Sequence, residues 1–185
     1  MLENGYMFLK YVLSQGWGEL ATGNDSRNEP QSNALLRTTL RYPLYSKGDL
    51  DGAIAEYRTA IRLHPDFAAA HYNLGIALAK KGDLDGAIAE YRTAIRLKPD
   101  DAGDHYNLGI ALAKKGDLDG AMAEFRTAIR LQPDHASAHV CLGLVLKFKG
   151  DRRAALEEMR TAYLLDPRDS FIAQQYERLL REVNR

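Results

Sequence analysis

Apolar side chains recur every three or four residues through most of the chain, and this spacing predicts amphipathic α-helices. The pattern itself repeats, because the stretch at 71–99, HYNLGIALAKKGDLDGAIAEYRTAIRLKP, returns almost unchanged at 105–133. The same interval of 34 residues separates four prolines, Pro65, Pro99, Pro133 and Pro167. A fixed period of this length is typical of repeat proteins, in which each unit is one supersecondary motif that touches mainly its neighbours.

Local signals divide each regular unit into two helices. Gly82 and Gly116 stand where the first helix must end, since glycine adopts the left-handed conformation there without a Cβ penalty. Asp83 and Asp117 follow directly and offer acceptors to the free N–H groups of the second helix, as does the second aspartate of each Asp-Leu-Asp sequence. A proline two residues after the last apolar position prevents the second helix from continuing. Each unit is therefore predicted to be a helix hairpin.

The regular units share an ordered set of residues that resembles a known family. One unit carries His71-x2-Leu74-Gly75-x2-Leu78, then Ala87-x3-Tyr91 and Pro99. The next carries His105-x2-Leu108-Gly109-x2-Leu112, then Ala121-x3-Phe125 and Pro133. This order resembles the tetratricopeptide repeat, whose pattern is Trp-x2-Leu-Gly-x2-Tyr, Ala-x3-Phe and Pro. Histidine replaces tryptophan and leucine replaces tyrosine here, but the size and packing role of the side chains are retained.

The resemblance implies an all-α fold, a right-handed α-solenoid of stacked antiparallel helix hairpins with a C-terminal capping helix. The first unit departs most from the family, because Pro43 falls inside its first helix and Arg41 replaces the packing glycine. We expect an apolar N-terminal segment with a polar linker at 1–33, four repeats at 34–67 (degenerate), 68–101, 102–135 and 136–169, and the capping helix at 170–185.

Small and apolar residues predict where the helices pack. Gly75 and Gly109 should let the two helices of a hairpin approach closely, with small side chains on the facing surface at Ala87, Ala94, Ala121 and Ala128. In the capping helix, we expect a buried apolar stripe of Ile172, Tyr176, Leu179, Leu180 and Val183. Gln175 belongs to the polar side that we expect to face water.

Charge and cysteine content restrict the partners and the location. Lys+Arg and Asp+Glu each number 25, so the formal net charge is zero and no global field favours nucleic acid or an anionic membrane. The apolar run within residues 1–21 is shorter than the roughly 20 residues that span a bilayer, and it lacks the order of a signal peptide. The single cysteine, Cys141, excludes an intrachain disulfide and is expected to be a small buried residue. These features predict a cytoplasmic protein without a membrane span.

The sequence contains no catalytic constellation, so we expect no enzymatic activity, no cofactor and no metal. No serine lies in a G-x-S-x-G turn, and the glycines near residue 18 lack the Lys-Ser/Thr of a phosphate-binding loop. His71, His105 and His139 are 34 residues apart, which places them in one column along the array. Such a column does not converge on one ion, whose ligands must lie within about 2.1 Å of it. Packing or hydrogen bonding at the rim explains these histidines better.

The strongest functional signal is a surface. By resemblance to the family, the first helices line a concave groove that binds an extended peptide or a helix of another protein. The expected groove residues are Tyr72, Asn73, Ile76, Lys80, Tyr106, Asn107, Ile110, Lys114, Val140, Leu144 and Lys147. The two lysines Lys80 and Lys114 would favour acidic side chains or a terminal carboxylate. Two alternatives stay open: a structural scaffold that assembles as a homo-oligomer through residues 1–21, and a regulatory subunit of a separate enzyme.

Overall fold

The computed structural model describes residues 50–184, which form helices and no strands. The helices are α4 (Leu50–Leu63), α5 (Ala68–Lys81), α6 (Leu84–Leu97), α7 (Ala102–Lys115), α8 (Leu118–Leu131), α9 (Ala136–Phe148), α10 (Arg152–Leu165) and α11 (Ser170–Val183). The first helix predicted for the degenerate unit, with Pro43, lies outside the described residues, as does the predicted N-terminal segment.

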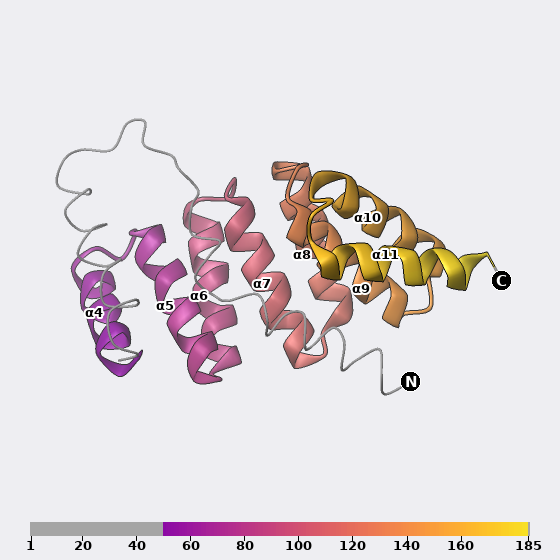
Figure 1. Cartoon of the computed structure of the whole chain (residues 1–185). Coiled ribbons are helices and arrows are strands. Elements are labelled where there is room, and N and C mark those ends of the chain that lie inside the picture. The colour runs from indigo at the N-terminus through magenta and orange to yellow at the C-terminus, as the bar shows by residue number, and fades with distance from the viewer. Residues whose placement is uncertain (1–49, 185) are drawn as a thin grey trace.

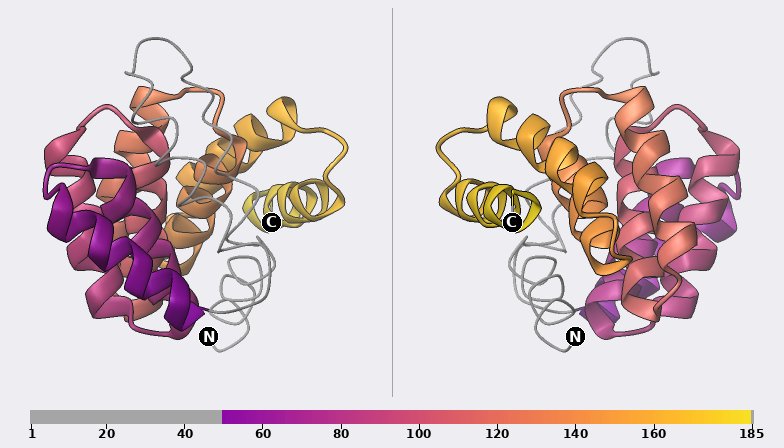
Figure 2. Two further views of the ribbon diagram at one scale, coloured as in Figure 1. Left: turned by 90° about the vertical axis from the view of Figure 1, so that its left-hand side faces the viewer. Right: turned by 90° about the vertical axis from the view of Figure 1, so that its right-hand side faces the viewer.

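Helices that follow one another in the chain pack side by side, so α5–α6, α7–α8 and α9–α10 form hairpins (Figure 1). The first helix of one hairpin also contacts the first helix of the next, because α7 touches both α5 and α9. Figure 2 looks along the array from each end and shows α4 and α11 running in different directions, so the stack twists. These features confirm the predicted all-α solenoid.

Glycine and aspartate end one helix and begin the next in each hairpin. Gly82 follows α5 with φ 89°, a conformation that costs glycine no Cβ clash. The carboxylate of Asp83 then accepts a hydrogen bond from the N–H of Gly86 at 2.9 Å, which caps α6. Gly116 and Asp117 repeat both features between α7 and α8. The sequence therefore predicted the hairpin turns and the caps formed by Asp83 and Asp117 correctly.

The second aspartate of each Asp-Leu-Asp sequence does not cap its helix, which corrects the prediction for these residues. Each one accepts a hydrogen bond from a lysine at the C-terminal end of the following first helix, in the pairs Lys81–Asp51, Lys115–Asp85 and Lys149–Asp119. The side chains are exposed, and such surface pairs contribute at most about 1 kcal/mol. Their regular recurrence links each hairpin to the next one along the edge of the array.

Glycine and alanine bring the helices of a hairpin together as expected. A Cβ atom added to Gly75 would lie 2.7 Å from Cε1 of Tyr91, and one added to Gly109 would lie 2.7 Å from Cε1 of Phe125. Both rings are fully buried, so they fill the space that a larger residue would need. The predicted small residues are also fully buried: Ala87, Ala94, Ala121 and Ala128.

The capping helix α11 buries a stripe that differs from the predicted one. Ile172 and Leu179 are buried as expected, but Gln175 is only 4% exposed whereas Leu180 is 38% exposed. The buried positions are spaced by three and four residues around 172, 175 and 179, so the helix is rotated toward Gln175 relative to the apolar stripe. Tyr176 stacks on a tyrosine of α10 at a ring distance of 5.4 Å, which keeps it at the edge of the buried face.

Candidate interaction surface

The eleven predicted groove residues all lie on the first helices α5, α7 and α9. Four of them remain partly exposed: Tyr72, Asn73, Lys80 and Lys114. The other seven are buried: Ile76, Tyr106, Asn107, Ile110, Val140, Leu144 and Lys147. The structure thus places the eleven residues on three neighbouring helices but leaves only four of them open to water.

A hydrogen bond between neighbouring first helices explains why Asn107 is buried. Its side-chain Nδ2 donates to the Tyr72 hydroxyl at 2.9 Å and to the Gly103 carbonyl at 3.0 Å. The two side chains are 35 residues apart, one more than the repeat, so they join successive hairpins. Asn107 therefore stacks the hairpins, whereas Asn73 in the preceding hairpin is partly exposed.

The same offset of 35 residues recurs twice further along the array. The Cys141 thiol lies 3.8 Å from the Tyr106 hydroxyl and donates to it, and the Tyr106 ring packs 6.0 Å from Phe125 and 4.7 Å from His135. The Lys147 ammonium donates to the Glu182 carboxylate of α11 at 3.1 Å. The offset is visible in the sequence, and a search for polar pairs one residue beyond the repeat would have found it.

Burial also accounts for the four aliphatic residues of the predicted set. They belong to the continuous hydrophobic core that runs through the hairpins, and they are Ile76, Ile110, Val140 and Leu144. Their apolar area is already removed from water in this structure, so they stabilise the array at about 25 cal/mol per Å² of apolar surface.

The lysines of the predicted surface differ in their electrostatic surroundings. Burial lowers the pKa of Lys80 and of Lys114, because their ammonium groups are partly removed from water. At the C-terminal end, burial opposes ionisation of Glu182, but Lys147 and then Arg178 outweigh it and lower the pKa of that carboxyl. Lys147, the buried lysine of this set, thus has a carboxylate as its partner within the chain.

Sequence reasoning missed a buried acid, Asp104, in the first turn of α7. The residue is 5% exposed, whereas the equivalent positions in the neighbouring hairpins are the fully buried alanines Ala70 and Ala138. Burial raises the pKa of the Asp104 carboxyl to about 8, and the Asp101 carboxylate adds to the increase. The sequence could have indicated this buried acid, because Asp104 occupies the repeat position at which the neighbouring hairpins have alanine.

The buried hydroxyl of Tyr91 has no hydrogen-bond partner among the described residues. Burial raises the pKa of this hydroxyl, and Tyr72 and Asp104 add to the increase.

Comparison with protein families identifies the repeats. A tetratricopeptide repeat model matches residues 44–102, and a second model, described as a TPR repeat, matches residues 111–150. Together these ranges cover more than half of the chain. The chain is a tetratricopeptide repeat protein. Members of this family are in general non-catalytic scaffolds for protein interaction. The comparison with curated proteins found no match to this chain.

Several solved structures share the tetratricopeptide repeat fold of this chain. A MamA structure from Desulfovibrio magneticus RS-1 is 22% identical, covers 85% of this chain and 88% of its own, and has a TM-score of 0.73. The Arabidopsis OM64 TPR domain is 20% identical over 60% of this chain and 93% of its own, with a TM-score of 0.58. A mutant O-GlcNAc transferase from Thermobaculum terrenum is 24% identical over 74% of this chain and 27% of its own, with a TM-score of 0.65. At such identities the likeness shows the fold alone.

Histidine stands where the tetratricopeptide repeat pattern has tryptophan, and the structure shows its role. Nδ1 of His71 lies 2.6 Å from a carboxylate oxygen of Glu90, and Nε2 lies 3.1 Å from the Pro65 carbonyl oxygen. The same two contacts recur at His105 and His139. Each ring thus lies between a carboxylate oxygen on one side and a backbone carbonyl oxygen on the other. Each histidine therefore joins the second helix of its own hairpin to the end of the preceding one.

The last of these histidines should titrate above its ordinary range. Burial alone would lower the pKa of His139, but hydrogen bonds to Glu158 and to the Pro133 carbonyl outweigh burial and raise it. We expect Glu158→Gln to lower the pKa of His139, measured by NMR titration of the ring, because a neutral amide no longer favours the imidazolium. The matched control is Glu157→Gln, an exposed neighbour that contacts Arg160 instead. An unchanged titration in Glu158→Gln would contradict this role.

The thiol of Cys141 is fully buried in α9. Burial raises the pKa of the Cys141 thiol to about 12, which keeps it protonated and unreactive as a nucleophile. Among residues 50–184, no group of three or more His, Cys, Asp or Glu side chains is placed to hold a metal ion. Every helix in this part of the chain is too short or too polar to cross a membrane.

Proposed function

We propose that this tetratricopeptide repeat protein is a non-enzymatic interaction module. It holds an extended peptide or a helix of another protein in a concave groove lined by α5, α7 and α9. The family and the stacked first helices support a protein partner in general. The partly exposed residues of these helices support the particular face, because they are the ones that stacking does not bury.

One observation carries the proposal: Lys80 and Lys114 occupy equivalent positions in successive hairpins, and both are partly buried with a lowered pKa. An ammonium group that has lost part of its hydration gains from a carboxylate, as Lys147 does from Glu182. The partly exposed Tyr72 and Asn73 lie on the same helix as Lys80 and add ring surface and a side-chain amide. This combination fits a polypeptide that carries acidic side chains or its terminal carboxylate.

The test is quantitative capture of partners from native lysate with the full chain. We expect Asn73→Ala, Lys80→Ala and Lys114→Ala in combination to reduce the captured partner at least about tenfold, the change that 1.4 kcal/mol of binding energy produces. Truncation at partly exposed positions should change the free energy of unfolding by only about 0.5 kcal/mol per site. The matched control is Lys81→Ala with Lys115→Ala, since these neighbouring lysines pair with aspartates at the edge of the array.

The capture experiment has four distinct outcomes. A protein retained by the wild type and the control but lost from the triple variant supports the proposal. Equal capture by all three contradicts it. Recovery of mainly the chain itself, abolished by deleting residues 1–21, would favour a self-associating scaffold instead. Recovery of an enzyme that does not depend on the three side chains would favour a regulatory subunit that uses another face.

A further inference from the structure

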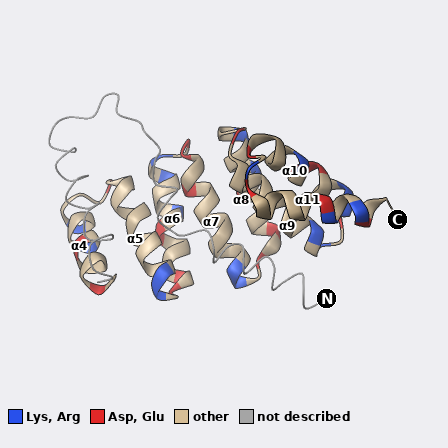
Figure 3. Ribbon diagram, viewed as in Figure 1, with Lys and Arg blue, Asp and Glu red and all other residues tan. Residues whose placement is uncertain are grey.

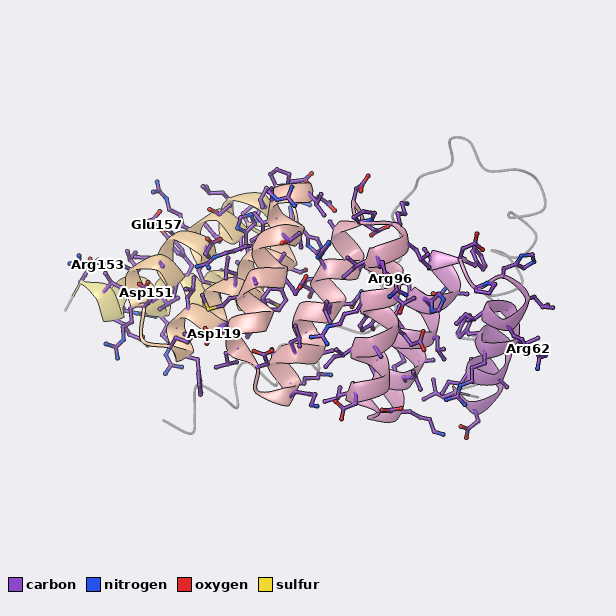
Figure 4. The ribbon with its side chains drawn as sticks, turned by 180° about the vertical axis from the view of Figure 1, so that it is seen from behind. Arg62, Arg96, Asp119, Asp151, Arg153 and Glu157 are labelled. Carbon is purple, nitrogen blue, oxygen red and sulfur yellow. The ribbon has the colours of Figure 1, made fainter. Side chains whose placement is uncertain are left out.

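The second helices carry arginines in two columns with the period of the repeat. Each of α4, α6 and α8 presents a pair four residues apart, and the pairs are Arg58 with Arg62, Arg92 with Arg96, and Arg126 with Arg130. All six are exposed. Residues four apart lie on one face of a helix, so each pair forms a single basic patch. Figure 4 shows Arg62 on α4 and Arg96 on α6, on the side of the molecule opposite to that seen in Figure 1.

None of these six arginines makes an ion pair with another residue in the range 50–184. The lysines at the edge of the array behave differently, because Lys81, Lys115 and Lys149 each have an aspartate partner. The acidic residues nearest to these arginines in the sequence of α6 and α8 already have other partners. Glu90 contacts His71, and Glu124 contacts His105. The basic charge of these helices is therefore left without a partner inside the described part of the chain.

The arginine columns end at α10, where the pattern changes. Arg160 keeps the first column but lies 4.0 Å from Glu157 on the same helix, and Leu164 replaces the second arginine. The unpaired arginines are thus confined to three successive second helices. We call this surface the outer arginine face, and it comprises the six arginines of α4, α6 and α8.

We propose that the outer arginine face binds an acidic segment of a partner polypeptide. Arginine favours this partner because its planar guanidinium makes two parallel hydrogen bonds to a carboxylate. Three equivalent pairs in a row suit a chain whose carboxylates recur at a regular interval. The site lies on the second helices and is separate from the surface of the first helices that holds the ligand in the proposed function.

Carboxylates at both ends of the arginine pairs make a single acidic chain a better fit than a broad polyanion. Asp51, Asp85 and Asp119 lie in the first turns of the same helices, and Asp66, Asp100 and Asp134 lie in the loops that follow them. Figure 3 shows that acidic and basic residues are interspersed along the ribbon. A nucleic acid duplex or an anionic membrane would bring phosphates against the aspartates of these loops, Asp66, Asp100 and Asp134, and the zero net charge supplies no attraction to offset that repulsion.

The test is fluorescence anisotropy of the full chain with a labelled peptide that carries glutamate at every third position. We expect binding that weakens as salt increases and that falls at least about tenfold in the variant Arg92→Glu with Arg126→Glu. The neutral version, Arg92→Gln with Arg126→Gln, should give an intermediate loss, which separates charge from misfolding. The matched control is Arg153→Glu, an exposed arginine of α10 outside the two columns.

Loss of peptide binding in the column variants, with the control unchanged and circular dichroism preserved in all, supports the proposal. Equal binding by wild type and column variants would overturn it, as would equally tight, arginine-dependent binding of duplex DNA or of phosphatidylserine vesicles. A peptide with glutamine at every glutamate position should not bind, and its binding would also overturn the proposal. These outcomes do not depend on the groove, because none of the variants touches α5, α7 or α9.

Discussion

Replacing Asp104 with alanine should stabilise the protein at neutral pH, by about 1–4 kcal/mol. The folded chain keeps a proton on this carboxyl up to about pH 8, whereas the unfolded chain releases it near pH 4. Holding that proton costs about 1.4 kcal/mol for each pH unit between those values. Alanine removes this cost, and the equivalent buried residues Ala70 and Ala138 show that the packing accepts it. Urea-induced unfolding at pH 7 measures the gain.

The pH dependence of the free energy of unfolding tests independently whether Asp104 destabilises the protein at neutral pH. The folded pKa of Asp104 lies above the unfolded value, so the native state binds more protons and the free energy of unfolding falls as pH rises from about 4 to about 8. This slope should largely disappear in Asp104→Ala. A smaller decline above about pH 6.5 should remain, because the raised pKa of His139 acts in the same direction. The control Asp100→Ala removes an exposed carboxylate and should leave the slope in place. A destabilised Asp104→Ala variant would show that the buried acid makes a favourable contact.

Adding one methyl group at Gly109 should have the largest destabilising effect, about 2 kcal/mol or more in the free energy of unfolding. The new Cβ would lie 2.7 Å from Cε1 of the Phe125 ring, which is fully buried. Alanine in place of glycine would otherwise favour the helix by about 1 kcal/mol, so the clash must exceed that gain. Denaturant unfolding of Gly109→Ala, measured beside the wild type, gives the difference.

Gly143 provides the matched control in the last hairpin. A Cβ there would meet the Ala155 carbonyl at 3.2 Å and the flexible Met159 side chain at 3.3 Å, so the neighbours need to shift only slightly. Gly143→Ala should therefore stay within about 1 kcal/mol of the wild type. Equal losses at Gly109 and Gly143 would mean that the aromatic ring does not set the hairpin spacing.

The fold could be predicted because each of its local signals repeats with the 34-residue period. The turn at Gly82 and Asp83, the close contact at Gly75 and the stop at Pro99 each have a physical reason that does not depend on distant parts of the chain. These local preferences all agree with the stacked arrangement of the hairpins. The fold of such an array can therefore be predicted from its sequence.

The candidate surface was harder to predict, because the repeat shows which residues share a column but not how deeply stacking buries them. Tyr72 and Tyr106 are equivalent in sequence, yet the first is partly exposed and the second is fully buried between Phe125 and His135. The difference comes from contacts with the next hairpin, which departs from the repeat. Gln175 in α11 is buried for a similar reason, since the packing of the final helix and not its apolar stripe sets its rotation.

The most direct measurement of the central proposal is site-specific photo-crosslinking from the first helices. A photoreactive amino acid at Asn73 should form a covalent adduct with a segment of a partner protein, and mass spectrometry should map it to an acidic stretch or a C-terminus. The same amino acid at Glu177, exposed on α11, should give no such adduct. Adducts from Glu177 but none from Asn73, with the chain folded in both cases, would contradict binding in the groove.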